Sequence, residues 1–370
     1  MKKGWETRRI DELCIVVAGQ SPEGKFYNSE GRGLPFYQGK KDFGEKFIEA
    51  PTTWTTQTTK IAKQGDILMS VRAPVGPVNF STEEICIGRG LAAIRCGTQL
   101  NRDFLFYQLL HLQPEIAGKE GAVFASINKS EIEALPLAFT PLPEQQRIVG
   151  VLDETFAGLA TAQANAEKNL LNARALFESH LNDVFTKRGK EWKRKKLGEL
   201  CDILDSQRKP ITKRDRTAGE YPYYGATGIV DYVNDFIFNE PLVLVGEDGA
   251  KWESGENTAF TIEGKCWVNN HAHVLRPHRK IVIDNWLVHY LNHSNLSEFV
   301  SGLTVPKLNQ GSLREIPIPL PPLSEQQRIV GLLDALSAET KCLACLYERK
   351  LATLASLKKS LLHQAFAGEL

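Results

Sequence analysis

Two acidic residues, Glu247 and Asp248, stand side by side in the glycine-rich segment GEDGA, where paired carboxylates could hold a divalent metal ion for nuclease chemistry. Acids between glycines more commonly form a turn, so we assign them no catalytic role. The chain lacks GxGxxG after a strand, GxxxxGK[ST], HExxH and GxSxG, and also the NPPY-like tetrad and FxGxG sequence of adenine methyltransferases. We therefore expect no catalytic residue, and a protein that is not an enzyme.

Histidine and cysteine pairs are the remaining candidates for metal chemistry. His271 and His273 in NNHAHVL alternate as residues on one face of a strand would, and we interpret them as polar strand or loop residues. Cys342 and Cys345 form a CxxC pair, but no second CxxC or histidine pair lies within sequence reach to complete four zinc ligands. We expect two small residues on a helix and no metal site.

Basic residues gather locally although the net charge is only +1. The segments QGKK (38–41), TKRGKEWKRKK (186–196) and QRKPITKRDR (207–216) would suit contacts with nucleic-acid phosphates. A charge run alone equally describes a solvated face, so these segments do not decide between the two.

Composition indicates an ordinary globular protein. The 370 residues have room for two to three domains, and 42% are hydrophobic. There is no apolar signal core at the start and no long apolar run, and the seven cysteines lack a disulfide-like spacing. We expect a soluble, cytoplasmic protein without membrane contact.

The elements that must position any site are duplicated. EQQRIVG occurs at 144–150 and again at 325–331, and the flanking residues 126–153 and 307–334 correspond at the same offset. Repeats of this length do not arise by chance, and between the matching blocks the copies diverge almost completely. The chain therefore contains two units of roughly 185 residues, each with a shared frame and a private middle.

Each repeat opens a long amphipathic helix. Residues 144–185 contain no proline, and apolar residues recur at helical spacing there and again from Ile329 to Leu361. Each helix would be roughly 60 Å long. Because neither can leave such a stripe in water, we expect the two to pack as an antiparallel coiled coil. Outside this seam, Leu332, Leu346 and Leu362 should be exposed.

The segments before the helices predict α/β units. Short β-like runs such as DILMSVRA, ICIGRGLAAIRC, PLVLVGED and HAHVLRP are bounded by Gly, Pro and Asn, and residues 102–118 and 284–300 read as amphipathic helices. The alternation is too irregular for a doubly wound sheet. The expected fold is thus two α/β domains separated by two long antiparallel helices, with a pseudo-twofold internal repeat.

Two divergent α/β units alternating with two near-identical helices, introduced by PLPEQQRIV and PLSEQQRIVGLLD, closely resemble the specificity subunit of type I restriction-modification systems. The resemblance covers the whole chain. It implies a first target recognition domain at 1–142, a central spacer helix at 143–185, a second recognition domain at 186–323 and a C-terminal spacer helix at 324–370.

The resemblance also implies a function in phage defence. Such a subunit binds double-stranded DNA at a bipartite, asymmetric target, and its helices dock two modification (methyltransferase) subunits, which are joined by restriction subunits. S-adenosylmethionine, ATP and Mg would be bound by those partners, so we expect no cofactor in this chain.

Base reading in the major groove favours Arg and Lys for guanine, and Asn and Gln for adenine. We expect the divergent middles to carry the specificity, above all Lys40, Arg72, Lys251 and Asn270. Asn128 and Asn309, shared between the copies, are equally typical of turns. The candidates are Gln38, Lys40, Lys41, Arg72, Arg89, Ser126, Asn128 and Lys129 in the first domain, and Arg208, Lys209, Tyr224, Thr227, Lys251, Asn269, Asn270, His271, Lys307 and Asn309 in the second.

Other functions stay open at this point. A coiled-coil scaffold with protein-binding α/β modules would explain the helices but not the divergent domains with basic loops. A standalone nuclease or methyltransferase would need an unrecognised site. A DNA reader belonging to another defence or fused system would differ only in its partners.

Overall fold

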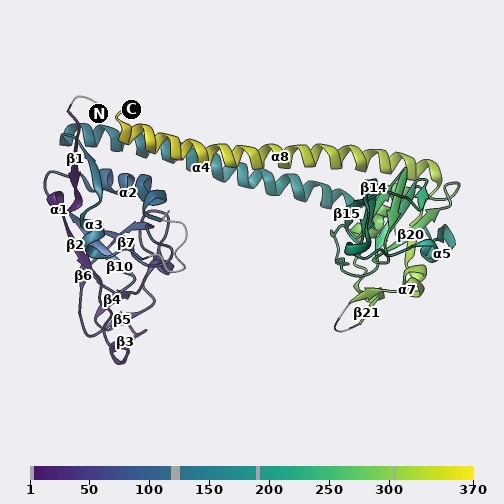
Figure 1. The fold of residues 1–370 in the computed structure, drawn as a ribbon, viewed down its shortest axis with the longest axis horizontal. Coiled ribbons are helices and arrows are strands. Elements are labelled where there is room, and N and C mark those ends of the chain that lie inside the picture. Colours follow the sequence, from purple (N-terminus) through teal and green to yellow (C-terminus); the bar gives the residue numbers. More distant parts are fainter. Residues whose placement is uncertain (1–3, 118–125, 189–191, 303, 305) are drawn as a thin grey trace. The chain divides into compact units, whose positions relative to one another are not determined.

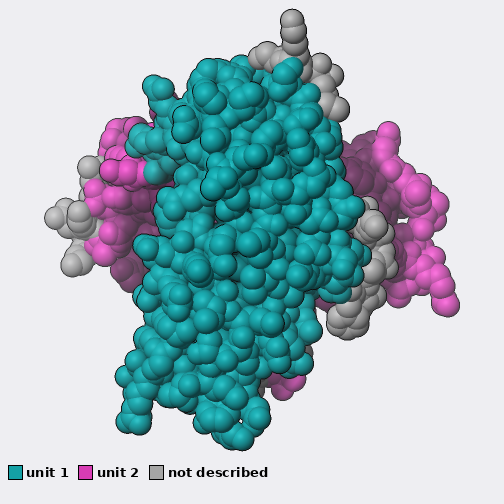
Figure 2. Space-filling view, turned by 90° about the vertical axis from the view of Figure 1, so that its left-hand side faces the viewer, with its two compact units in different colours: residues 1–166, 350–370 teal, residues 167–349 magenta. Residues whose placement is uncertain are grey.

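The computed structural model describes residues 4–117, 126–188, 192–302, 304 and 306–370 of the chain (Figure 1). The chain forms two compact units: residues 1–166 with 350–370, and residues 167–349, coloured separately in Figure 2. Two long helices, α4 (Leu142–Asn182) and α8 (Leu323–Ala367), each contribute to both units. Within the described residues, no helix is both long and apolar enough to cross a membrane.

The first unit is built on an antiparallel sheet whose strands are ordered β2–β10–β7–β8. Strands β7 and β10 are rich in Ile, Leu and Ala and are largely buried, which is typical of strands covered on both faces. The strands of this sheet are β2 (Cys14–Ala18), β7 (Ile67–Ser70), β8 (Val78–Phe80) and β10 (Leu91–Cys96). A second sheet, ordered β3–β5–β4–β9–β6, comprises β3 (Tyr27–Asn28), β4 (Leu34–Tyr37), β5 (Trp54–Thr55), β6 (Ile61–Ala62) and β9 (Ile85–Ile87).

Short elements complete the first unit. Strand β1 (Glu6–Arg9) pairs antiparallel with β11 (Pro136–Phe139), directly before α4. The helices are α1 (Ile10–Leu13), α2 (Arg102–Ala117) and α3 (Lys129–Glu133). Because α2 buries Phe104, Leu105 and Leu109, it anchors the core that also takes up Ile148 and Leu152 of α4.

The second unit repeats this plan. Its main antiparallel sheet is ordered β13–β20–β17–β18, with β13 (Cys201–Ile203), β17 (Leu242–Gly246), β18 (Ala259–Ile262) and β20 (Ala272–Pro277). The other sheet is ordered β15–β14–β19–β16, with β14 (Ala218–Gly225), β15 (Gly228–Val233), β16 (Phe238–Asn239) and β19 (Lys265–Val268). The unit also contains β12 (Lys193–Lys196) paired with β23 (Pro317–Leu320), β21 (Val300–Ser301) paired with β22 (Lys307–Leu308), and the helices α5 (Leu197–Leu200), α6 (Asp284–His293) and α7 (Gln310–Glu315).

The strand orders show that the duplication runs through the divergent middles. Strands β2, β10, β7 and β8 of the first unit have the same order and antiparallel pairing as β13, β20, β17 and β18 of the second. In both units a parallel pair, β4 with β9 and β14 with β19, lies in the other sheet. The predicted α/β class and internal repeat are therefore confirmed.

A buried glutamine in each repeat fastens the long helix to the domain before it. Gln145 and Gln326 are both 0% exposed. The Gln145 amide donates to the carbonyls of Gln99 and Thr140 and accepts from the Asn101 N–H. Gln326 makes the equivalent set, donating to Ile281 and Pro321 and accepting from Ile283. The repeated glutamine thus attaches each long helix to the domain before it.

The long helices pack against each other in opposite directions. In the first unit Arg147 donates to the carbonyl of Leu370 at 2.8 Å, and Phe156 lies under the Lys358 ammonium, so increasing numbers on α4 meet decreasing numbers on α8. In the second unit Arg174 pairs with Glu348 at 2.9 Å. The antiparallel helix pair is confirmed. Cys342 and Cys345 lie on α8, as expected.

Two details of the prediction were wrong. Leu332 and Leu346 are exposed as expected, but Leu362 is only 6% exposed, because the end of α8 enters the first unit's core, where the Phe366 ring meets Phe104 edge to face. The helix predicted over 284–300 ends at His293, because the Asn295 side chain accepts the Ser297 N–H and starts a turn. The four-part division at 142, 185 and 323 stays a prediction.

Replacing Gln326 with alanine should destabilise the second unit. The substitution leaves the Ile283 N–H and the Ile281 and Pro321 carbonyls without their partner in a buried site. We expect a loss of about 1–3 kcal/mol in the free energy of unfolding. Hydrogen exchange of peptides from α6 measures it, with Gln327→Ala on the exposed side of the same turn as the matched control. Equal protection in both variants would contradict the attachment role.

Candidate nucleic-acid interface

Loops at one edge of the first unit's main sheet enclose a recess of about 270 Å³. Its lining includes a cluster of predicted base-reading residues: Arg72, Arg89, Ser126, Asn128 and Lys129. Arg72 follows β7, Arg89 lies between β9 and β10, and the other three precede or begin α3. Five candidates that are distant in the sequence thus lie around one recess, and their role in DNA reading stays a prediction.

Backbone hydrogen bonds join these loops. The Val71 N–H donates to the Gly90 carbonyl at 3.0 Å, and the Ile127 N–H donates to the Val71 carbonyl at 3.1 Å. The residues on either side of Arg89, Gly88 and Gly90, are glycines because the Gln38 segment passes close by. A Cβ at Gly88 would lie 2.6 Å from Gln38 Oε1, and a Cβ at Gly90 would lie 2.4 Å from the Gln38 carbonyl oxygen. The recess therefore has a fixed backbone.

Gln38, which directly follows β4, supports the recess from the side. Ser21 Oγ donates to Gln38 Oε1 at 2.9 Å and accepts the Arg89 N–H at 3.2 Å. Lys40 and Lys41 follow in a short 3-10 turn and are exposed, with Lys41 lying 3.8 Å from Asp42. These two lysines are not part of the recess lining.

The shared asparagines have different contacts in the two units. The Asn128 side chain accepts the Glu131 N–H at 3.0 Å while Glu131 accepts the Asn128 N–H, which forms a capping box for α3. Asn309 precedes α7 but donates to Ser301 Oγ at 2.7 Å instead. The turn role is therefore established for Asn128, and the DNA role stays a prediction for both.

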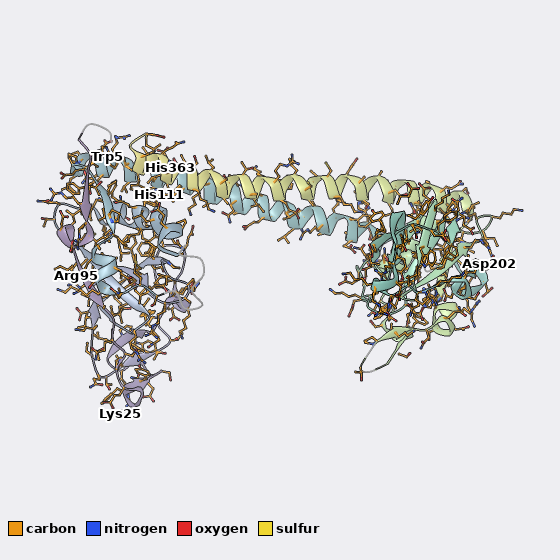
Figure 3. The ribbon with its side chains drawn as sticks, in the orientation of Figure 1. Trp5, Lys25, Arg95, His111, Asp202 and His363 are labelled. Carbon is orange, nitrogen blue, oxygen red and sulfur yellow. The ribbon has the colours of Figure 1, made fainter. Side chains whose placement is uncertain are left out.

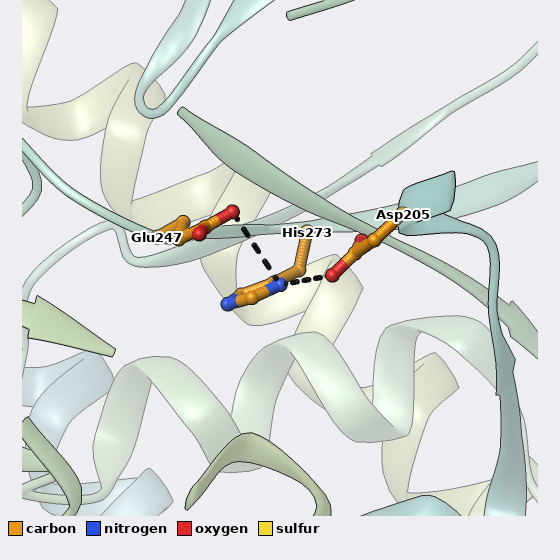
Figure 4. Close-up of side chains that lie close together, drawn as sticks. All are labelled: Asp205, Glu247 and His273. Atoms are coloured by element: carbon orange, nitrogen blue, oxygen red, sulfur yellow. Dashed lines mark hydrogen bonds and ion pairs between the residues drawn. The ribbon is translucent and has the colours of Figure 1, made fainter. Parts of the chain in front are cut away.

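At the equivalent edge of the second unit, a buried ionic network takes the place of the recess. His273 in β20 is 0% exposed, and its Nδ1 lies 2.6 Å from Asp205 Oδ2 and 3.8 Å from Glu247 Oε2 (Figure 4). Its Nε2 lies 2.7 Å from the Leu308 carbonyl oxygen. Both ring nitrogens thus face oxygens inside the unit.

Asp205, Glu247 and His273 also bring their ligand atoms within 4.8 Å of one another. In the structure His273 contacts both carboxylates directly, and both of its ring nitrogens face oxygens. Asp205 also accepts the Val274 N–H and the Gln310 amide. Asp205 was not among the predicted site residues, since one aspartate in LDSQRK carries no signal of its own.

The neighbouring cations hold the two carboxylates ionised. Burial raises the pKa of Asp205, but hydrogen bonds from His273, Val274 and Gln310 and the histidine charge reverse this and lower it below the ordinary value. Burial likewise raises the pKa of Glu247, but hydrogen bonds from Lys307 and Arg208 outweigh this effect and lower it below the ordinary value. The hydrogen bond to Glu247 raises the pKa of Lys307.

Arg208 and Lys307, both predicted base readers, are members of this network. The Arg208 guanidinium is mostly buried, where it contacts Glu247 and donates to the Ala272 carbonyl at 2.8 Å. Lys307 Nζ lies 2.8 Å from Glu247 and 3.9 Å from Asp248. In this structure the two cations tie three loops together. The acids of GEDGA thus take part in a structural network at the end of β17.

The other candidates in the second unit fall into two groups. Beside the network, Asn269 is buried and accepts the His271 N–H at 2.8 Å, His271 contacts Asp248, and Asn270 is exposed. Elsewhere, Lys251 pairs with Glu256 at 3.3 Å, and Thr227 is exposed in the β14–β15 turn. Lys209 is exposed, and half-buried Tyr224 packs near Phe260. Figure 3 shows how densely side chains line both units.

The sequence matches the family described as "Type I restriction modification DNA specificity domain" over residues 2–172 and again over residues 189–344. The chain belongs to this family. The two matches confirm the duplication and the resemblance drawn from EQQRIVG, and a recognition subunit accords with the absence of catalytic motifs.

Relatives and solved structures agree with this assignment. A putative type I restriction enzyme specificity subunit from Haemophilus influenzae is 41% identical over 150 residues, 40% of this chain and 38% of that protein. The putative MjaX specificity subunit of Methanocaldococcus jannaschii is 42% identical over 39% of this chain and 35% of that protein. The aligned part thus spans less than half of either relative.

Two solved structures share the fold over nearly their full length. A chain from a structure titled as showing complex assembly and conformational transition of the type I R-M system aligns over 100% of this chain and 99% of its own, with a TM-score of 0.80 and 20% identity. The HsdS subunit of Thermoanaerobacter tengcongensis aligns over 100% and 98%, with a TM-score of 0.62 and 19% identity. At this identity the likeness concerns the fold.

Acid should loosen the second unit through Asp205 and Glu247. In the folded state the pKa of Asp205 lies below its ordinary value of 3.8, and that of Glu247 lies below 4.5. At a pH between the folded and the ordinary values, the unfolded chain therefore binds more protons than the folded chain. Their stabilisation is complete above pH 4.5 and is lost as the pH falls through the folded values. Hydrogen exchange of β20 peptides, corrected for intrinsic rates, should show this loss.

Two aspartate variants make the acid experiment specific. Asp205→Asn should destabilise the unit at neutral pH, by about 3 kcal/mol for a broken buried pair, and reduce its sensitivity to acid. Asp202→Asn alters a more exposed partner of His278 and is the matched control. Identical acid profiles for Asp205→Asn and the unchanged chain would count against the network as the cause.

Proposed function

We propose that this chain is the specificity subunit of a type I restriction-modification complex, which reads a bipartite, asymmetric sequence in double-stranded DNA. Each unit reads one half-site, and the repeated helix surfaces dock two modification subunits, through which restriction subunits join. Those partners carry S-adenosylmethionine, ATP and Mg. The complex would act in the cytoplasm against foreign DNA.

One observation carries the proposal: the two units share the same strand order and helix attachment but carry different side chains on their loops. The sheet orders and the Gln145 and Gln326 attachments are equivalent in the two units. At the same position in each, however, a bridge joins Arg72 to Ser126 in one unit and Asp248 to Lys307 in the other. Equal supports with unequal side chains suit two readers of different half-sites.

The outward side of the repeat supports docking of two identical partners. Val151 and Leu332 occupy equivalent positions and are 36% and 54% exposed. One turn earlier on each helix, Arg147 lies 2.8 Å from Glu144 and Arg328 lies 2.8 Å from Glu325. Because an apolar residue beside an ion pair recurs on both helices, the same partner surface can bind twice.

Selection from a randomised duplex library should reveal the bipartite target. We expect the chain, purified with its co-expressed modification subunit, to retain duplexes that share two different short motifs at a fixed separation. Sequencing of the bound fraction measures this, and single-stranded competitor controls for charge-driven binding. Retention without any shared motif would contradict the proposed function.

Docking should depend on Val151 and Leu332. The double variant Val151→Asp/Leu332→Asp places charges in both apolar contacts, and we expect the amount of co-purified modification subunit to fall at least about tenfold. Leu171→Asp is the matched control, because this leucine is also exposed on α4 but lies outside the repeat. Equal recovery with both variants would place docking elsewhere.

A further inference from the structure

We infer that the recess of the first unit reads the acceptor edge of a guanine through Arg72 and Arg89, whereas the equivalent position of the second unit, at Asp248, reads no guanine. The inference rests on the proposed function and adds the chemistry of one half-site. Guanine presents O6 and N7 as two acceptors in the major groove, and a guanidinium can donate to both at once.

The charge of the recess favours this base. Among the described residues of its lining there are three cations, Arg72, Arg89 and Lys129, and no carboxylate. Lys129 lies 3.4 Å from Glu133, so its charge is partly used within α3. Neither guanidinium forms an ion pair within the part of the chain that the structure describes, and both residues are exposed. Two donor groups are therefore left for an external acceptor.

The fixed backbone favours a base edge over a phosphate. Phosphates are bound through charge at many geometries, while base reading requires donors held in place. Arg89 is held between two glycines that pack on Gln38, and its N–H is bound by Ser21 Oγ. Arg72 is held by the neighbouring Val71–Gly90 and Ile127–Val71 backbone bonds. Little conformational entropy then remains to be lost by the loops on binding.

The second unit has the opposite arrangement at the same place. Asp248 stands where the first unit has Arg72, because each forms the bridge to the segment before the last short helix, at Lys307 or Ser126. The nearby cations Arg208 and Lys307 are already bound to Glu247. A guanine edge would meet a carboxylate here, and two acceptors repel each other.

The test repeats the library selection with Arg72→Ala, Arg89→Ala and Arg72→Lys, each in the full chain with its modification subunit. Arg32→Ala is the matched control. Arg32 is an exposed arginine of the same unit, and within the described residues it forms an ion pair only with Glu30. We expect one half of the selected motif to contain guanine. Its enrichment should fall at least about tenfold with either alanine variant, while the other half is unchanged.

The lysine variant and the salt dependence separate base reading from phosphate binding. Arg72→Lys keeps the charge but loses the planar fork, so guanine selection should weaken while total binding is retained. A uniform loss of binding with an unchanged motif and a smaller salt slope would identify phosphate contacts and overturn the inference.

The remaining outcomes keep this inference apart from the proposed function. A bipartite motif whose halves both ignore the arginine substitutions would overturn the inference and leave the proposed function standing. The Asp248→Asn variant should leave the guanine of the first half-site unchanged, and its loss there would also contradict the assignment. Absence of any motif with the unchanged chain would overturn both.

Discussion

A single buried side-chain amide in each half of the molecule determines how the rest is arranged. Gln145 and Gln326 lie on the first turn of a long helix, and each satisfies two carbonyls and one N–H of the preceding domain. A buried amide with unmatched partners is costly, so the domain and helix can meet in only one geometry. The same glutamine used twice gives both domains the same attachment, however different their loops become.

The two domains differ in how they accommodate the charged groups at the edge of the main sheet. Charged groups at a sheet edge must be solvated, paired or used. The first unit leaves Arg72 and Arg89 exposed around a recess, whereas the second buries His273 with Asp205 and Glu247 and surrounds them with Arg208 and Lys307. A buried ionic network is stable only when every charge in it has a partner. This explains why so many charged groups of the second unit contact one another.

Sequence alone predicted what periodicity and repetition encode. The helix spacing from Ile148 to Val184 and the EQQRIVG repeat led directly to the antiparallel helices and the duplicated α/β units. It also placed Arg72, Arg89, Ser126 and Asn128 in one candidate set, which the structure gathers around one recess. It failed where long-range packing decides: Leu362 was expected to be exposed, yet it is buried in the first unit's core. It also gave no sign that Arg208 is held by Glu247.

These failures follow from how far apart the deciding partners lie. Asp205 and His273 are 68 positions apart, and Arg208 and Glu247 are 39 apart. No local rule of spacing or propensity connects residues so distant in the sequence, and the divergent middles offer no second copy to compare. The strands and helices shared by the two units can be predicted because the duplication repeats them, whereas the loops differ between the units and cannot be predicted by comparing the copies.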